Sequence, residues 1–279
     1  MKANTVPPTT APVQNPKSRV VWLVVCMGLI GGIGCVTQSS LTPAQQMALQ
    51  QEAQALEQKT AQGDLLATTR LAIRYLDGSR GVSRDVSKGL RLLNQAADRQ
   101  YAPAEFALGI VYADGPFLYL DGSHTYLQAP QEPVRGMELF KRSATHACTI
   151  APLLPWSSTA ITISTKYRSG SSATVDLQQA DLWLARSILH CRYPSAQYVV
   201  GMNLNPKATV PPSKADTMGF LLLMPPSNAA SKLQSTLSPQ EMQTAMRKAE
   251  ALRQAVAESE KQYPAPPAPP APPPPPGKP

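Results

Sequence analysis

The sequence has few of the residues on which most catalytic and metal-binding sites depend. Only 3 of its 279 residues are histidine and 4 are cysteine, while charged residues make up 16% of the chain and aromatic residues 6%. These low numbers argue against a metal enzyme with several histidine ligands and against a small domain held together by disulfides. Hydrophobic residues still make up 43% of the chain, which is enough to bury a sizeable core in one or two domains.

Motifs for catalysis and for cofactor binding are also missing from the sequence. The serine run at residues 169–172 has no histidine and acid placed to activate it, and a serine cluster of this kind is typical of a turn. No glycine-rich phosphate loop follows a strand, because no segment shows a convincing strand pattern. We therefore expect neither catalysis nor a cofactor, and we assign no metal site.

The net charge of +8 does not indicate nucleic-acid binding. Three basic residues, Lys2, Lys17 and Arg19, precede the first apolar segment, and the rest of the chain carries 23 basic and 18 acidic residues. Basic residues alternate with acidic ones, and no run of five or more lysines or arginines occurs. We expect a mildly basic, solvated surface and no nucleic-acid partner.

The N-terminal segment has the layout of a secretory signal sequence. Residues 20–34 form an apolar run of 15 residues that follows Lys17 and Arg19 and ends in small residues directly before Cys35. A helix needs about 20 residues to cross a bilayer, so this length favours a cleaved segment. The sequence Gly-Ile-Gly-Cys at residues 32–35 resembles the lipobox of bacterial lipoproteins.

That resemblance implies that Cys35 becomes the first residue of the mature chain and carries the lipid. Residues 1–34 are then the signal sequence, and residues 35–41 are the lipidated cysteine and a linker. Several acyl chains anchor a protein firmly to a membrane. Val36 follows the cysteine instead of aspartate, which in the sorting rule of these lipoproteins implies the outer membrane, with the protein facing the periplasm. The alternative is an uncleaved inner-membrane anchor with the same periplasmic orientation.

A degenerate repeat organises the middle of the chain. Three segments have a tyrosine followed three residues later by a glycine: Tyr75 with Gly78, Tyr112 with Gly115, and Tyr167 with Gly170. A second set of similar segments follows them, beginning at Lys88, Arg135 and Gln179. A period of 37 residues between the first two tyrosines, lengthened to 55 by an insertion before the third, is typical of stacked helical hairpins.

The residue types suit such hairpins. Small residues let two helices approach closely, and they are Ala72, Ala107 and Gly109. Large apolar residues of the second helices fill the space between neighbouring hairpins, and they are Leu93, Phe140 and Trp183 or its neighbour. The glycine after each tyrosine provides the turn that ends the first helix.

Residues 71–89 (LAIRYLDGSRGVSRDVSKG) resemble the Sel-one-like repeat family, which is related to tetratricopeptide repeats. The matching positions are Tyr75, Gly78, Gly81, Val82, Asp85 and Lys88. Residues 104–115 match the first helix of the next repeat, and residues 195–201 look like the start of a fourth. The resemblance implies an all-α solenoid of helical hairpins over residues 42–204 that binds other proteins. A Gln-, Ala- and Leu-rich helix capped by Thr42 begins this domain.

Two long segments interrupt or follow the repeats, and both carry apolar side chains. The insertion at residues 116–133 is aromatic, and the proline-containing segment 205–237 includes an apolar run at 219–224. Long loops with exposed apolar residues favour a partner surface, and the alternative is that they fold back over the end of the solenoid. The candidate partner-binding residues are Phe117, Tyr119, Tyr126, Phe220 and Leu222.

Cys148 and Cys191 fall at the ends of the second helices of consecutive hairpins, displaced by one residue in the alignment. This placement predicts a disulfide. A pair of buried thiols is one alternative. A zinc site that also uses His146 and His190 is the other, although the spacings are not those of known zinc modules.

The chain ends in a terminal helix and a tail. Residues 238–262 begin with a Ser-Pro-Gln-Glu capping pattern, and residues 263–279 are rich in proline, which predicts a polyproline II rod. The tail is interpreted as a spacer, with a ligand for an aromatic groove and a cell-wall tether as alternatives.

Taken together, these features predict a non-catalytic outer-membrane lipoprotein that binds envelope proteins. The expected role is a scaffold or assembly subunit of a multi-subunit machine for secretion, conjugation, pilus formation or polysaccharide export. The alternative is a protein that binds peptidoglycan or regulates a cell-wall enzyme.

Overall fold

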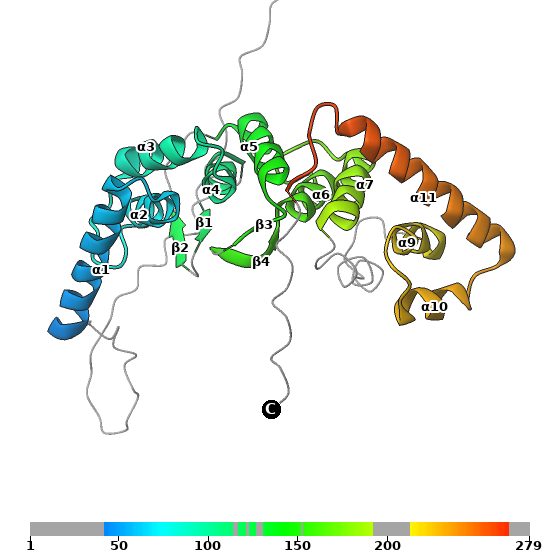
Figure 1. Ribbon diagram of the computed structural model, residues 1–279, viewed down its shortest axis with the longest axis horizontal. Helices are drawn as coiled ribbons and strands as arrows, with labels where there is room; N and C mark the ends of the chain where they lie inside the picture. The colour runs from blue at the N-terminus through cyan, green and yellow to red at the C-terminus, as the bar shows by residue number, and fades with distance from the viewer. Residues whose placement is uncertain are drawn as a thin grey trace, which may run out of the picture. The chain divides into compact units, whose positions relative to one another are not determined.

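A computed structural model describes residues 42–113, 117–120, 123–126, 131–151, 153–191 and 213–267 (Figure 1). The chain divides into two units, residues 1–40 and 41–279, and all described residues belong to the second. Its elements are α1 (Pro43–Ala61), α2 (Leu65–Asp77), α3 (Val86–Ala97), α4 (Ala102–Ala113), β1 (Phe117–Leu120), β2 (Ser123–Tyr126), α5 (Pro133–His146), β3 (Thr149–Ile150), β4 (Leu154–Ser158), α6 (Thr159–Ser169), α7 (Leu177–Arg186), a π-helical turn η1 (Ser187–Cys191), α9 (Lys214–Leu221), α10 (Asn228–Gln234) and α11 (Pro239–Ser259).

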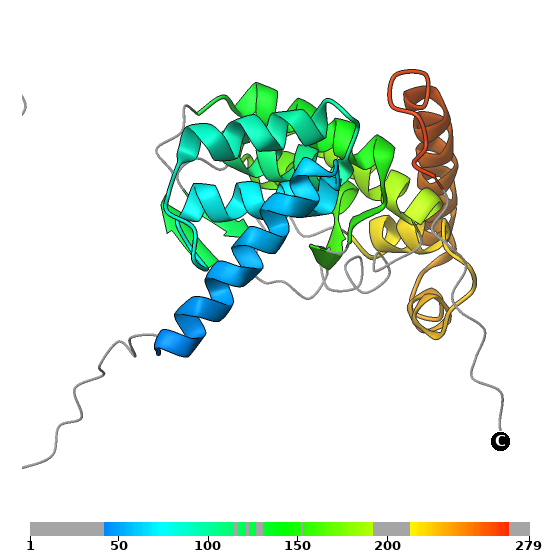
Figure 2. The same cartoon turned by 60° about the vertical axis from the view of Figure 1, so that its left-hand side comes forward.

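The prediction of an all-α fold built from helical hairpins is confirmed. Helices α2 and α3 pack as the first hairpin, α4 and α5 as the second, and α6 and α7 as the third. Helix α1 packs against α2, and α11 packs against α9 and α7. The pairing of α9 with α11 is visible in both views of the molecule (Figure 1, Figure 2).

The expectation that the chain contains no strands is wrong. The insertion after α4 forms an antiparallel hairpin of β1 and β2, with Phe117 opposite Tyr126. A second small hairpin joins β3 and β4, with Thr149 opposite Ser158. The sequence between β1 and β2 is Asp-Gly, the pair most typical of a two-residue hairpin loop, and this signal was available in the sequence.

The same backbone hydrogen bond joins the two helices of all three hairpins, although the connection between the helices is longer in the second. The backbone N–H of the residue that caps the second helix donates to the carbonyl of the repeat tyrosine: Asp85 to Tyr75 at 2.8 Å, Glu132 to Tyr112 at 3.1 Å, and Asp176 to Tyr167 at 3.0 Å. Asp85 and Asp176 also accept a hydrogen bond on their side chains from the N3 backbone N–H, at Lys88 and Gln179. The tyrosine position is therefore the point at which each second helix is fixed to its first helix.

Close packing within the hairpins depends on small residues. A Cβ atom added to Gly109 would lie 2.7 Å from the ring of Phe140, and one added to Gly89 would lie 2.8 Å from the carbonyl oxygen of Ala72. The main core runs through the three hairpins, and its fully buried large side chains include Leu76, Leu93, Leu108, Phe140 and Trp183. The roles expected for Leu93, Phe140 and Trp183 agree with this packing.

The prediction that residues 205–237 form a loop is wrong for the parts that the structure describes. Ser213 and Asp216 form a capping box at the start of α9, and Ser227 caps α10. Phe220 is only 1% exposed and packs in a second core with Leu184 and Leu252. This segment therefore folds back onto α7 and α11, as the alternative to a partner surface predicted. Its apolar run is buried in the core that it shares with these two helices.

Candidate functional site

The Tyr-Gly repeat positions have architectural roles. Gly78 and Gly170 end α2 and α6 in the left-handed conformation, with φ of 69° and 74°, and Gly81 has φ of 81°. The Tyr75 hydroxyl donates a 2.8 Å hydrogen bond to Glu57 of α1. Arg135 lies 4.2 Å from the ring centre of Tyr112. Gly115 lies outside the described residues, as do residues 195–201, the expected start of a fourth repeat.

The expected partner-binding residues lie at two places, three of them in the β1–β2 hairpin and two at α9. Phe117, Tyr119 and Tyr126 belong to β1 and β2, whose side chains lie outside what the structure describes. The assignment of Phe220 as a partner-binding residue is wrong, because the ring is buried beneath α11 and Lys248 lies 4.8 Å from its centre. Leu222 is only partly buried and packs against the same core.

Cys148 and Cys191 form a disulfide, with their Cα atoms 5.3 Å apart. The bond ties the segment after α5 to the end of η1, so it links the second and third hairpins. The zinc and free-thiol alternatives do not describe this structure. Both sulfur atoms are bonded to each other, and the two histidines have other partners. His146 Nδ1 lies 2.7 Å from Glu105, and His190 Nε2 lies 3.0 Å from Glu260.

Glu105 is a fully buried carboxylate beside this disulfide-linked region. Its two oxygens lie 2.9 Å from Arg142 and 2.7 Å from His146, both on α5. A carboxylate without solvent needs such partners, because an unpaired buried charge is costly. Glu105 therefore fixes α4 to α5 and is not free to act on a ligand.

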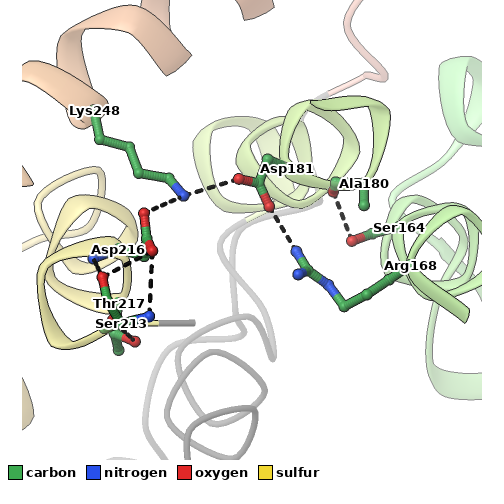
Figure 3. A network of polar contacts seen from close by, with 8 residues as sticks. All are labelled: Ser164, Arg168, Ala180, Asp181, Ser213, Asp216, Thr217 and Lys248. Carbon is green, nitrogen blue, oxygen red and sulfur yellow. Dashed lines mark hydrogen bonds and ion pairs between the residues drawn. The ribbon is translucent and has the colours of Figure 1, made fainter. Parts of the chain in front are cut away.

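A polar network joins the third hairpin to α9 and α11 (Figure 3). Asp181 on α7 accepts from Arg168 at 2.6 Å and from Lys248 on α11 at 2.8 Å. Lys248 also lies 2.9 Å from Asp216 on α9. The hydrogen bonds from Lys248 and Ser213 outweigh the effect of burial and hold the pKa of Asp216 below its ordinary value. The network fixes four helices together: α6, α7, α9 and α11.

The segment that follows α11 contacts two buried side chains of the third hairpin, Trp183 and Arg186. Arg186, at the end of α7, is 2% exposed. Its guanidinium donates to the Ser259 hydroxyl at 2.6 Å, to the Tyr263 carbonyl and to the Pro264 carbonyl at 3.1 Å. The Tyr263 ring lies 5.3 Å from the Trp183 ring, at 58° to it. The C-terminal segment is thereby held against α7.

A pocket of about 390 Å³ adjoins this segment. Its lining comes from α5, α6, α7 and the end of α11, and includes Glu138, Lys141, Tyr167, Gln179, Ser259 and Tyr263. Burial alone would lower the pKa of Lys141, but the hydrogen bond with Glu138 at 2.7 Å and the nearby tyrosines Tyr167 and Tyr263 raise it overall. Lys141 therefore carries a stable positive charge at this surface.

Sequence reasoning missed Lys141, Arg186 and Tyr263 as members of a site. Arg186 bonds residues 73 to 78 positions further along the chain, so no local pattern connects them. Cys35 and the apolar run at 20–34 lie outside the described residues. Within the described residues, no group of three metal-ligating side chains occurs and no helix is long and apolar enough to span a membrane.

The sequence matches no protein-family model, and no curated protein matches it. Two solved structures are similar in fold. One is a protective antigen of uropathogenic Escherichia coli strains displaying an SLR fold, with 14% identity, a TM-score of 0.40, and coverage of 75% of this chain and 43% of that chain. The other is a Sel1 repeat protein from Oxalobacter formigenes, with 14% identity, a TM-score of 0.42, and coverage of 74% of this chain and 80% of that one. The present chain thus spans less than half the length of the first structure.

Proposed function

We propose that the protein is a non-catalytic outer-membrane lipoprotein that faces the periplasm and holds protein partners together in a larger envelope assembly. The assembly belongs to the class of machines for secretion, conjugation, pilus formation or polysaccharide export. The lipid on Cys35 keeps the helical array at the membrane. The array supplies the surface for partners.

The disulfide between Cys148 and Cys191 is the observation that best supports this placement. Disulfides persist in oxidising compartments such as the bacterial periplasm and are rare in the cytosol. A secretory leader that ends in a lipobox-like sequence at residues 32–35 brings the chain to such a compartment. The leader and the disulfide are independent features of the chain, and they favour the same location.

The array of helical hairpins supports an interaction role. Stacked repeats expose a long surface made from several units, and proteins of this architecture use it to bind other proteins. Fold alone does not fix function, so the role must be tested on the protein itself.

The location is tested by expressing the full chain and two variants, Cys35→Ala and Cys26→Ala, in a Gram-negative host. We expect the wild-type chain to have the intact mass of a chain that begins at a triacylated Cys35, and to be found in the outer-membrane fraction. Cys35→Ala should lose both properties. Cys26→Ala, with its change inside the leader, is the matched control and should be processed normally. A wild-type chain that keeps residues 1–34 and ignores Cys35→Ala would contradict the proposal and favour an inner-membrane anchor.

The interaction role is tested by cross-linking in isolated outer membranes, followed by identification of the linked proteins. We expect the same envelope proteins to be linked to the wild type and to the Cys26→Ala control. Binding to isolated peptidoglycan without any linked protein would contradict the scaffold role and favour the cell-wall alternative.

A further inference from the structure

The segment after α11 lies against α5 and α7, through contacts of Tyr263 with Lys141 and Trp183. We call residues 263–267 the strap, and the surface formed by Lys141, Trp183 and Arg186 the strap site. The strap has no helical or strand structure, and Pro264 is exposed while Tyr263 is only partly buried. It is held by the packing of the Tyr263 ring near Trp183, by the two carbonyls that it offers Arg186, and by a 2.8 Å hydrogen bond from the Tyr263 N–H to the Ser259 carbonyl.

The contacts of Arg186 recognise backbone, not a particular side chain. Its guanidinium bonds the carbonyls of two consecutive residues, Tyr263 and Pro264. Proline has no backbone N–H, and a proline-rich extended chain has no internal hydrogen bonds, so its carbonyls are available to an outside donor. Any peptide in the same extended conformation can offer Arg186 the same two acceptors.

The side chain of Tyr263 supplies the selectivity. Its ring lies 5.3 Å from Trp183, and the Lys141 ammonium lies 5.4 Å from its centre. Trp183 is fully buried, so the strap covers the edge of the core at this point. An aromatic ring placed between an indole and an ammonium gains both ring packing and a cation–π interaction.

The adjoining pocket gives a second peptide room to enter. Its volume of about 390 Å³ lies beside Tyr263 and between Glu138, Gln179 and Leu182. Release of the strap takes two acceptors from the buried Arg186 guanidinium and leaves it Ser259, and an incoming peptide that offers two carbonyls restores them. A competing peptide can therefore start to bind before the strap has left.

We propose that the strap site binds extended peptides with an aromatic–proline pair, and that the chain's own Tyr263–Pro264 occupies it until such a peptide from a partner protein displaces it. This inference names the class of partner segment for the interaction role proposed above and rests on that role. The strap is thus an autoinhibitory occupant. Its release uncovers the site and at the same time frees the base of the proline-rich tail.

The test measures peptide binding to the purified full chain in detergent by fluorescence anisotropy. The probe is a labelled peptide with the sequence of residues 258–270, and a second probe carries alanine in place of its tyrosine. The chain is used as wild type, as Tyr263→Ala, which releases the strap, and as Lys261→Ala, a control two positions before Tyr263 whose exposed side chain does not line the pocket. Hydrogen exchange at the amides of residues 259–263 and of Ala265 reports whether the strap has been released, since the prolines of the strap carry no N–H.

We expect Tyr263→Ala to bind the first probe at least about tenfold more tightly than wild type, because a tethered occupant competes at a high effective concentration. Lys261→Ala should behave as wild type, and the alanine probe should bind none of the chains. Adding Arg186→Gln to Tyr263→Ala should abolish binding. If that double variant does not fold, the comparison of the two probes still decides the question.

Two results would overturn the proposal. One is a Tyr263→Ala chain that shows strap release by hydrogen exchange and still does not bind the probe. The other is equal binding to wild type and Tyr263→Ala. Light scattering distinguishes a partner protein from a second copy of this chain as the source of the peptide. If two copies exchange their straps, wild type should self-associate at high concentration and Tyr263→Ala should not. Failure of peptide binding leaves the lipid-anchor and cross-linking experiments unaffected, so the two proposals fail separately.

Discussion

Removing the disulfide should destabilise the protein by a predictable amount. The bond joins residues separated by 43 positions, and the loop that it closes contains the whole third hairpin. A cross-link acts mainly by restricting the unfolded chain, and the chain-entropy relation for a loop of this length gives about 13 cal/mol/K, or about 4 kcal/mol at 25 °C. We expect Cys148→Ala/Cys191→Ala to lose about this much free energy of unfolding.

The assay is urea denaturation followed by far-ultraviolet circular dichroism. All proteins carry Cys26→Ser and Cys35→Ser, so that Cys148 and Cys191 are the only remaining cysteines. The parent is measured once oxidised and once in reductant, and thiol titration confirms each state. Reduction of the parent should reproduce the loss seen in the double variant. Cys148→Ala alone should lose at least as much, because one substitution already removes the bond.

An oxidised parent that is less than about 1 kcal/mol more stable than the double variant would refute this reasoning. It would mean that the unfolded chain gains little freedom when the bond is absent, either because it keeps residual structure or because native-state strain offsets the gain. A parent that contains two free thiols after oxidation would contradict the bond itself and would remove the main support for an oxidising compartment.

Variants at three further positions test helix packing, a helix cap and a titrating histidine, each by its free energy of unfolding. Gly136→Ala should cost about 1–3 kcal/mol, since its Cβ would lie 2.5 Å from the Cβ of Ala113, and no loss would mean that the helices separate easily. Asp176→Ala should lower the free energy of unfolding by about 1 kcal/mol, because α7 loses its N-cap. Asp176→Asn should keep most of the stability, because asparagine also caps helices. Burial lowers the pKa of His190 below its ordinary 6.5, although Glu260 opposes this. Just below pH 6.5 the unfolded chain therefore binds more protons than the folded chain, so the free energy of unfolding should fall as the pH drops from 7 toward 5. The fall should be less steep in His190→Gln than in wild type.

The hairpins are predictable from sequence because the interactions that define them are local. The turn after Tyr75 needs a left-handed glycine at position 78 and a capping aspartate at position 85, and both lie within ten residues of the tyrosine. The same spacing logic holds for Tyr167 and Gly170. These local signals can be recognised in a single sequence even where insertions lengthen the repeat period.

The errors lie where the burial of a residue depends on distant parts of the chain. An apolar run such as residues 219–224 has the same sequence pattern whether it contacts a partner protein or a neighbouring helix. Phe220 is buried because α11 packs over it, and the run itself does not show this. Prolines around the run suggested a loop, although the capping box at Ser213 is a helix start signal within the same segment. The contacts between Arg186 and Tyr263 could likewise not be predicted from a local pattern, because 77 positions separate the two residues.

The third hairpin is tied to its surroundings on several sides, and this bears on how the strap can act. The disulfide links its end to the second hairpin, Asp181 links α7 to Lys248 of α11, and the second core packs Leu184 against α9 and α11. None of these contacts involves the strap. Release of Tyr263 therefore removes an occupant from a surface whose other supports remain, so the strap site should keep its geometry for an incoming peptide. A site that collapsed when its occupant left could not exchange one peptide for another. The disulfide at one end of the third hairpin and the Asp181–Lys248 ion pair on α7 keep the site in place, so one peptide can replace another.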